Sequence, residues 1–220
     1  MENDLGNDLH MLWALSKDFG ASGFRVGVLY TQNKHIIRAM GNLNIFSSVS
    51  HPMQIMVSEM LKDETFVDSY LSTSRNLLQR SYNVVVKSLE EMNIPYIPAK
   101  AGIFLYCDFS SVLPPTKSDD NGGNVKEKSV TCKGDDFYES NSDIMTYKAE
   151  RQFSSVLLKC IRLVMTPGEC QRDINPGMFR ICYAYVSIDV LIIGMKRLKE
   201  FIYHIRNKGW EGIDQGVSMV

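Results

Sequence analysis

Residues 16–31 read SKDFGASGFRVGVLYT and place one lysine, Lys17, eight positions before an arginine, Arg25, with Gly20 and Gly23 between them. If both cations are to contact one small molecule, this segment must fold back, because eight extended residues span about 26 Å. Glycine adopts backbone angles that are closed to other residues, so Gly20 and Gly23 permit such a turn. The stretch therefore predicts a sharply folded connection leading into a strand; a plain surface loop is the alternative.

The composition is that of a globular protein with a substantial core. The chain has 220 residues, 45% hydrophobic and 22% charged, with a net charge of −1, enough for one large or two small domains. This charge gives no general attraction to nucleic acid or anionic lipid. No apolar run approaches the ~20 residues of a spanning helix, and the polar start MENDLGNDLH is unlike a leader. We expect a cytoplasmic protein with neither a nucleic-acid nor a membrane partner.

Cysteine and histidine spacing does not indicate a metal site. The five cysteines form no CxxC pair, and the four histidines show neither HxxxH nor HExxH spacing. An odd number of cysteines also argues against a disulfide framework. We expect free thiols that behave as small hydrophobic side chains.

Apolar periodicity predicts strands alternating with helices, which is typical of the α/β class. Leu78, Tyr82, Val85, Leu89 and Met92 recur at helical spacing and so share one helix face. The expected strands are 10–16 (a buried strand end), 24–31, 101–109, 160–165 and 178–186. The expected helices are 32–42, 52–92, one that ends near 159, and one from an N-cap at Ser187 to Gly209, with a core stripe of Leu191, Met195, Leu198, Ile202 and Ile205.

Residues 114–143 depart from this pattern, because Ser, Asp, Asn and Gly crowd the stretch. Such a segment buries too little apolar surface to offset its ordering entropy. We interpret it as a flexible insertion between a strand and a helix; a regulatory or partner-binding loop is the alternative.

A third cation lies in the segment PGMFRICYA. Strand alternation puts Arg180 on the same face as Met178, Cys182 and Ala184, two of which are small and leave room for a guanidinium to reach outward. An arginine within an otherwise apolar strand needs a partner. A buried lysine amine with two arginines is what recognition of a dianionic cofactor and a carboxylate substrate would require.

Three separated blocks resemble pyridoxal-phosphate enzymes of aminotransferase class I/II. The similarity is greatest to 1-aminocyclopropane-1-carboxylate synthases and their animal synthase-like members. The blocks are SKDFGASGFRVGVLY, the stretch from FVDSYLSTSRN to AGIFLYCDF, and LVMTPGECQRDINPGMFRICYAYVSIDVLIIGMKRL. They follow one another in the family's order. The resemblance implies the C-terminal part of a fold-type-I transferase, with pyridoxal 5'-phosphate as the cofactor.

The resemblance also implies individual roles. Lys17 matches the catalytic lysine that forms a Schiff base with the cofactor and then moves the α-proton. Arg25 matches the arginine that binds the cofactor phosphate, and Arg180 the arginine that binds the substrate α-carboxylate. Ser16 is a candidate cofactor ligand, with a structural hydroxyl as the alternative. Many relatives have a phosphate-binding serine three residues before the lysine, where this chain has Ala14, which weakens the expected phosphate site.

Other cofactor-binding residues of the family precede the lysine, so we expect this chain to be the C-terminal portion of such a protein. The expected function is Schiff-base chemistry on an amino acid, by transamination or by elimination, in a homodimer. The alternative is a catalytically silent dimerisation or binding module. The expected parts are a large-domain remnant (1–62), a linking helix (63–95), a small domain (96–209, with the insertion 114–143) and a tail (210–220).

Overall fold

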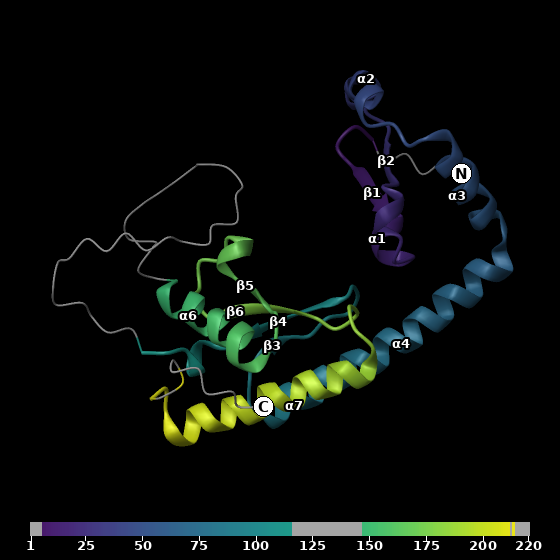
Figure 1. The fold of residues 1–220 in the computed structure, drawn as a ribbon. Coiled ribbons are helices and arrows are strands. Elements are labelled where there is room, and N and C mark those ends of the chain that lie inside the picture. Colours follow the sequence, from purple (N-terminus) through teal and green to yellow (C-terminus); the bar gives the residue numbers. More distant parts are fainter. Residues whose placement is uncertain (1–5, 116–146, 212, 214–220) are drawn as a thin grey trace. The chain divides into compact units, whose positions relative to one another are not determined.

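The computed structural model describes residues 6–115, 147–211 and 213, which form two compact units that adjoin in sequence at Leu77 and Leu78 (Figure 1). Helices and strands mix in the chain, as the α/β class requires. The predicted insertion lies outside the described residues from residue 116 onward, and so does most of the predicted tail. The division into four parts stays a prediction.

The first unit is built on a hairpin of two antiparallel strands. Strand β1 (His10–Ala14) pairs with β2 (Gly27–Thr31), with His10 opposite Thr31 and Ala14 opposite Gly27. The helices of this unit are α1 (Leu15–Asp18), the short 3₁₀ helices η1 (Ser22–Phe24) and η2 (Asn44–Phe46), α2 (Lys34–Leu43), α3 (His51–Lys62), and the first half of α4 (Glu64–Glu91).

Polar side chains cap the starts of α2 and α4. The Asn33 carboxamide oxygen accepts hydrogen bonds from the backbone N–H groups of His35 and Ile36, at 3.0 and 3.3 Å, and so caps α2. The Asp63 carboxylate accepts from the N–H of Phe66 at 2.9 Å at the start of α4. Asp63 also separates α3 from α4, so the helix predicted over 52–92 is two helices.

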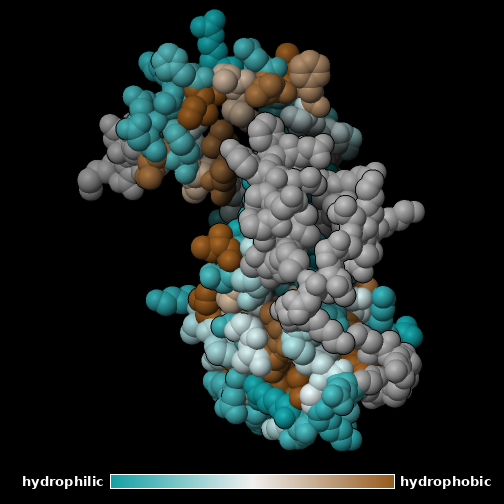
Figure 2. Space-filling view, turned by 90° about the vertical axis from the view of Figure 1, so that its left-hand side faces the viewer, coloured by the Kyte–Doolittle hydropathy of each residue, from teal (hydrophilic) through white to brown (hydrophobic). Residues whose placement is uncertain are grey.

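Few apolar side chains are buried in the first unit. Among its described residues, Leu15 and Val57 are the buried hydrophobic ones, whereas Leu12, Ile45 and Phe46 are 81%, 77% and 89% exposed. Figure 2 shows brown apolar surface of this kind in the upper part of the view. The strand predicted at 10–16 is found at His10–Ala14, but its predicted burial is wrong: among the described residues β1 pairs only with β2, and His10 to Leu12 are exposed.

The second unit contains a four-stranded antiparallel sheet. The strand order is β3-β4-β6-β5, so the central strands β4 and β6 come from distant parts of the chain. The strands are β3 (Tyr96–Ile97), β4 (Phe104–Asp108), β5 (Thr166–Pro167) and β6 (Met178–Cys182). The other elements are the second half of α4, η3 (Ser110–Val112), α6 (Lys148–Val156), the π-helical turn η4 (Leu157–Ile161), η5 (Glu169–Gln171) and α7 (Ile188–Lys208).

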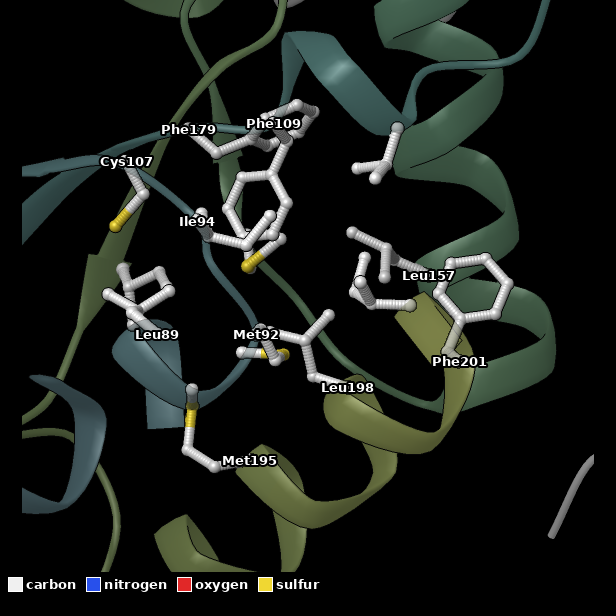
Figure 3. Close-up of a cluster of buried hydrophobic side chains, with 14 of the residues drawn as sticks. Leu89, Met92, Ile94, Cys107, Phe109, Leu157, Phe179, Met195, Leu198 and Phe201 are labelled. Atoms are coloured by element: carbon white, nitrogen blue, oxygen red, sulfur yellow. The ribbon is translucent and has the colours of Figure 1, made fainter. Parts of the chain in front are cut away.

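One face of this sheet packs on the helices to form the core (Figure 3). Side chains alternate along β4 and β6, so that Leu105, Cys107, Phe179 and Ile181 are buried. Burial raises the pKa of the Cys107 thiol to about 12. The predicted stripe of α7 is confirmed, because all five of its residues are buried: Leu191, Met195, Leu198, Ile202 and Ile205.

The strand predicted at 160–165 is wrong. Leu157 and Ile161 are four positions apart and both buried, so the helical face of α6 continues through a π-helical turn instead of ending before Cys160. The turn ends at Arg162, whose φ of 60° is left-handed. The strand follows later and is only the pair Thr166–Pro167.

Candidate functional site

The connection between β1 and β2 contains three of the four predicted site residues. It leaves the sheet at Ala14 and returns at Gly27, which are paired residues, so the chain folds back as expected. The N–H of Leu15 donates to the Val26 carbonyl at 3.3 Å, which closes the connection at its base. Leu15 is fully buried and its carbonyl accepts from Phe19 and Ala21.

One of the two predicted glycines makes the turn. Gly20 has a φ of 61°, in the left-handed region that glycine adopts without steric cost. Gly23 lies in η1 and has no positive φ, so the second left-handed residue is Arg25 itself, with φ 54°. This conformation is uncommon for a residue with a side chain.

An aromatic pair fastens the connection to α4. The rings of Phe19 and Tyr70 stack with centroids 5.4 Å apart, and the Tyr70 hydroxyl donates to the Phe19 carbonyl at 2.8 Å. On the strand side, the Trp13 indole N–H donates to the Asp18 carboxylate at 2.5 Å. Both contacts hold the connection where α1 ends, at Asp18 and Phe19.

Within this connection Lys17 and Arg25 are exposed, and Ser16 is half-buried. The expected burial of the lysine amine is not found, because α1 buries only Leu15. The Arg25 guanidinium donates to the Ser22 carbonyl at 3.1 Å, which restricts its orientation. An amine and a guanidinium thus occupy one short, closed connection.

Arg180 belongs to the second unit and lies at the centre of β6. Strand pairing puts Tyr106 of β4 and Thr166 of β5 directly opposite it on its two sides. Its guanidinium carbon lies 4.3 Å from the centroid of the Phe104 ring, within the range of a cation–π contact. One of its N–H groups donates to the Thr166 hydroxyl at 3.3 Å. The sequence predicted that this arginine needs a partner, and it has two.

Arg180 has no acidic partner among the described residues. A guanidinium carries five N–H donors in a planar fork that matches a carboxylate. The described contacts use one face of the guanidinium and one of its donors, so the other N–H groups have no hydrogen bond to the described residues. Neither Phe104 nor Thr166 was predicted, because no motif marks them and only the pairing of distant strands brings them to Arg180.

The described residues were also compared with the patterns of a metal site and of a membrane-spanning helix. No group of His, Cys, Asp and Glu that could hold a metal occurs in residues 6–115 and 147–211. Within the same part of the chain, no helix is long and apolar enough to span a membrane.

Solved structures identify the fold of the chain as that of fold-type-I aminotransferases. An aromatic aminotransferase from Pyrococcus horikoshii OT3 is 20% identical, covers 90% of this chain and has a TM-score of 0.68, with 43% of that structure matched. The Thermus thermophilus aspartate aminotransferase solved with maleate is 16% identical, with a TM-score of 0.65 over 88% of this chain and 41% of that structure.

Sequence comparison identifies the family. The family model for aminotransferase class I and II matches residues 2–198, so the chain belongs to that family, whose members depend on pyridoxal phosphate. The curated relatives include 1-aminocyclopropane-1-carboxylate synthase 4 of Oryza sativa subsp. japonica, 29% identical over 91% of this chain. Synthase 7 of Arabidopsis thaliana is 29% identical over 88% of it. The chain spans 36% and 37% of the lengths of these two relatives.

Proposed function

We propose that the chain is part of a pyridoxal-phosphate-dependent enzyme that acts on an α-amino acid through Schiff-base chemistry. The observation that supports this proposal is the closed connection between β1 and β2, because both Lys17 and Arg25 belong to it. Membership of the aminotransferase class I and II family supports the choice of cofactor. The similar proteins include both synthases and aminotransferases, so the reaction is either transamination or a synthase-like elimination.

The residues of the connection fit an aldehyde that carries a phosphate. Arg25 would bind the phosphate, because charge-assisted hydrogen bonds from a guanidinium are short and strong. Lys17 would supply the amine that binds the aldehyde and would then move the proton at the substrate α-carbon. Ser16, half-buried beside the lysine, is a further candidate ligand. The bound cofactor supplies an electron sink that weakens the bonds at that carbon.

Arg180 would bind the substrate carboxylate. Its half-buried position strengthens an ionic contact relative to bulk water, and the Phe104 ring and the Thr166 hydroxyl restrict its rotation. A restricted guanidinium loses less entropy when it binds a carboxylate than a free one does. A substrate with an α-carboxylate fits this arrangement.

Labelling of the 220-residue chain tests this role of Lys17. The chain is incubated with pyridoxal phosphate, reduced with borohydride and digested, and the modified lysine is located by mass spectrometry. We expect labelling at Lys17, with a visible absorbance band before reduction that Lys17→Ala abolishes. Lys34, an exposed lysine of the same unit, serves as the matched control. Equal labelling of Lys17 and Lys34 would contradict the proposal.

A second candidate function is a catalytically silent dimerisation or binding module of the same family. The exposure of Lys17 and the presence of Ala14 at the α1 N-cap favour it. A longer chain carrying the preceding part of the family fold decides between the two, because a silent module would bind no cofactor there either. Homodimer formation is also proposed, and sedimentation measures it directly; a cytoplasmic location stays a prediction.

A further inference from the structure

Glu150 in α6 is a completely buried carboxylate, with an exposed fraction of 0%. Among the described residues, none of the lysines and arginines forms an ion pair with it. Burial raises the pKa of Glu150, and two backbone hydrogen bonds oppose this effect. Burial of a carboxylate lowers the stability of the fold strongly unless hydrogen bonds replace those that the group made to water. These two bonds are therefore the compensation that Glu150 receives for its burial in the apolar face of α6.

The two oxygens of Glu150 hold both ends of the connection between β5 and β6. Oε1 accepts from the N–H of Glu169 at 2.9 Å, and Oε2 accepts from the N–H of Gly177 at 2.7 Å. Next to these residues, the N–H of Gly168 donates to the Met178 carbonyl at 2.7 Å. The carboxylate thus joins positions that are eight residues apart in sequence and adjacent in the fold.

The Gly177 peptide has no freedom to move away from this carboxylate. Its φ is 101°, and a Cβ at this position would lie 2.7 Å from the Ser110 Cα. Its carbonyl accepts from the N–H of Phe109 at 2.8 Å. Only glycine fits here, and the peptide that precedes β6 is fixed on both sides.

The same connection is also fastened to the strand on the other side of Arg180. The Tyr106 hydroxyl, from the β4 residue opposite Arg180, donates to the Asp173 carboxylate at 2.5 Å. Burial and, after it, this hydrogen bond raise the pKa of Tyr106, and the same hydrogen bond lowers the pKa of Asp173. Strand β5 consists of only Thr166 and Pro167. It pairs with β6 at these two positions only, and the connection held by Glu150 begins directly after Pro167, next to the Thr166 hydroxyl that contacts Arg180.

We propose that Glu150 is a positioning residue for Arg180: by joining the two ends of the connection between β5 and β6, it fixes Thr166 opposite the guanidinium. This inference rests on the proposed carboxylate-binding role of Arg180. Glu150 touches neither substrate nor cofactor in this role. It acts through the backbone N–H groups of Glu169 and Gly177.

The experiment uses the whole 220-residue chain and maleate, a dicarboxylate, as the probe. The Nε–Hε resonance of Arg180 is identified by its loss in Arg180→Lys and is followed by NMR during titration at constant ionic strength. Glu150→Gln keeps the side-chain shape but sets an NH₂ group against a backbone N–H, since a carboxamide has one acceptor oxygen. We expect this variant to shift the Arg180 resonance and to weaken maleate binding about tenfold while the chain stays folded.

Glu169→Gln is the matched control. The Glu169 carboxylate is in the same connection and is held by Arg151, with Nε to Oε2 at 2.7 Å, but only its backbone N–H contacts Glu150. We expect this variant to leave the Arg180 resonance in place and the maleate affinity within about twofold, as for a partly exposed ion pair. Glu150→Asp keeps the charge with a shorter reach and should recover part of the affinity.

The outcomes separate the two proposals. If the wild type does not respond to maleate but Glu150→Gln still shifts the Arg180 resonance, the carboxylate-binding role fails and the positioning role holds. An unchanged resonance and affinity in a folded Glu150→Gln chain overturns the inference. If Glu150→Gln does not fold, hydrogen exchange of the backbone N–H groups is measured instead, in the wild type and in Glu150→Asp. The N–H groups of Glu169 and Gly177 must then be protected in the wild type and released together in the variant; rapid exchange in the wild type overturns the inference.

Discussion

At the residue scale, Ala14 is where this chain departs from the phosphate site expected for its family. Ala14 has an extended backbone at the N-cap of α1, and no side-chain hydrogen bond caps this helix. A serine at an N-cap normally accepts a hydrogen bond from the N–H of the second or third helical residue. The same hydroxyl could instead donate to a phosphate oxygen.

We predict that Ala14→Ser tightens the binding of pyridoxal phosphate by the 220-residue chain. One hydrogen bond to a charged oxygen contributes about 1.5 kcal/mol, or roughly tenfold in Kd. Fluorescence titration with the cofactor measures this. Ala21→Ser, at the N-cap of η1 in the same connection, is the control and should leave Kd unchanged. Equal affinities for Ala14→Ser and the wild type would mean that the phosphate does not approach residue 14.

The sequence predicted the roles of residues whose type is unusual for its position, such as a glycine in a tight turn or an arginine in an apolar strand. Gly20 has the positive φ that its place in the turn predicted, and Arg180 has the partners that an arginine in an apolar strand requires. Glu150 was missed, although its place between Ala149 and Phe153 on a helix face could have indicated a buried charge. Its partners are backbone N–H groups, which leave no trace in the sequence.

At the scale of elements, side chains of α7 bind the C-terminal end of α4 and the turn that follows it. The Lys199 ammonium lies 2.7 Å from the Glu91 carboxylate, and the Arg206 guanidinium donates to the carbonyls of Met92 and Asn93. Met92 and Asn93 directly follow the last residue of α4, so Arg206 holds the turn that leaves this helix, while Lys199 pairs with the side chain of its last residue. The end of α4 is therefore fixed by side chains from a helix more than a hundred residues away in sequence.

The ion pair between Lys199 and Glu91 gives a pH-dependent contribution to stability. A hydrogen bond from Lys199 lowers the pKa of Glu91 below its ordinary value of 4.5, and Glu91 raises the pKa of Lys199 above 10.5. The lowered carboxylate pKa means that the contribution is present above pH 4.5 and is lost as the pH falls through the folded value. The raised lysine pKa means that it is present below pH 10.5 and is lost as the pH rises further.

We predict that Lys199→Met lowers the Tm between these two pH limits and that the difference from the wild type disappears beyond them. Thermal unfolding across this pH range measures the effect, and added salt should reduce it. Lys196→Met is the control, because Lys196 is exposed and its ion pair, 3.9 Å to Glu200, lies within α7 itself. A pH-independent difference for Lys199→Met would mean that lost packing, not charge, causes it.

Helices were predicted well where an apolar repeat continued over several turns, whereas short apolar segments were assigned wrongly. The stripe on α7 spans four turns, so its burial follows from spacing alone. The short segment 160–165 is compatible with either a strand or the end of a helix. In the structure its start is helical, because Leu157 and Ile161 are buried on one helix face. The pairing of β4 with β6 joins residues that are at least 70 positions apart, and no local pattern indicates it.

At the scale of the whole molecule, the two units differ in how much apolar surface they bury. Leu15 and Val57 are the buried hydrophobic residues in the described part of the first unit, whereas the second unit contains a continuous cluster that includes Phe109, Phe153 and Phe179. Burial of apolar area is the main favourable term in folding. The first unit, which carries Lys17 and Arg25, should therefore open more easily than the second.

We predict that amide protons of β1 and β2 exchange with solvent faster than those of β4 and β6, and that pyridoxal phosphate slows exchange in the first unit only. A ligand that binds the folded form stabilises it by RT ln(1 + [L]/Kd), about 2.7 kcal/mol at a hundredfold excess over Kd. Hydrogen exchange measured with and without the cofactor tests both statements, with Lys17→Ala as the control that should show no protection. Protection of β4 and β6 without protection of β1 and β2 would mean that the cofactor binds through the second unit, and the connection at Lys17 would lose its proposed role.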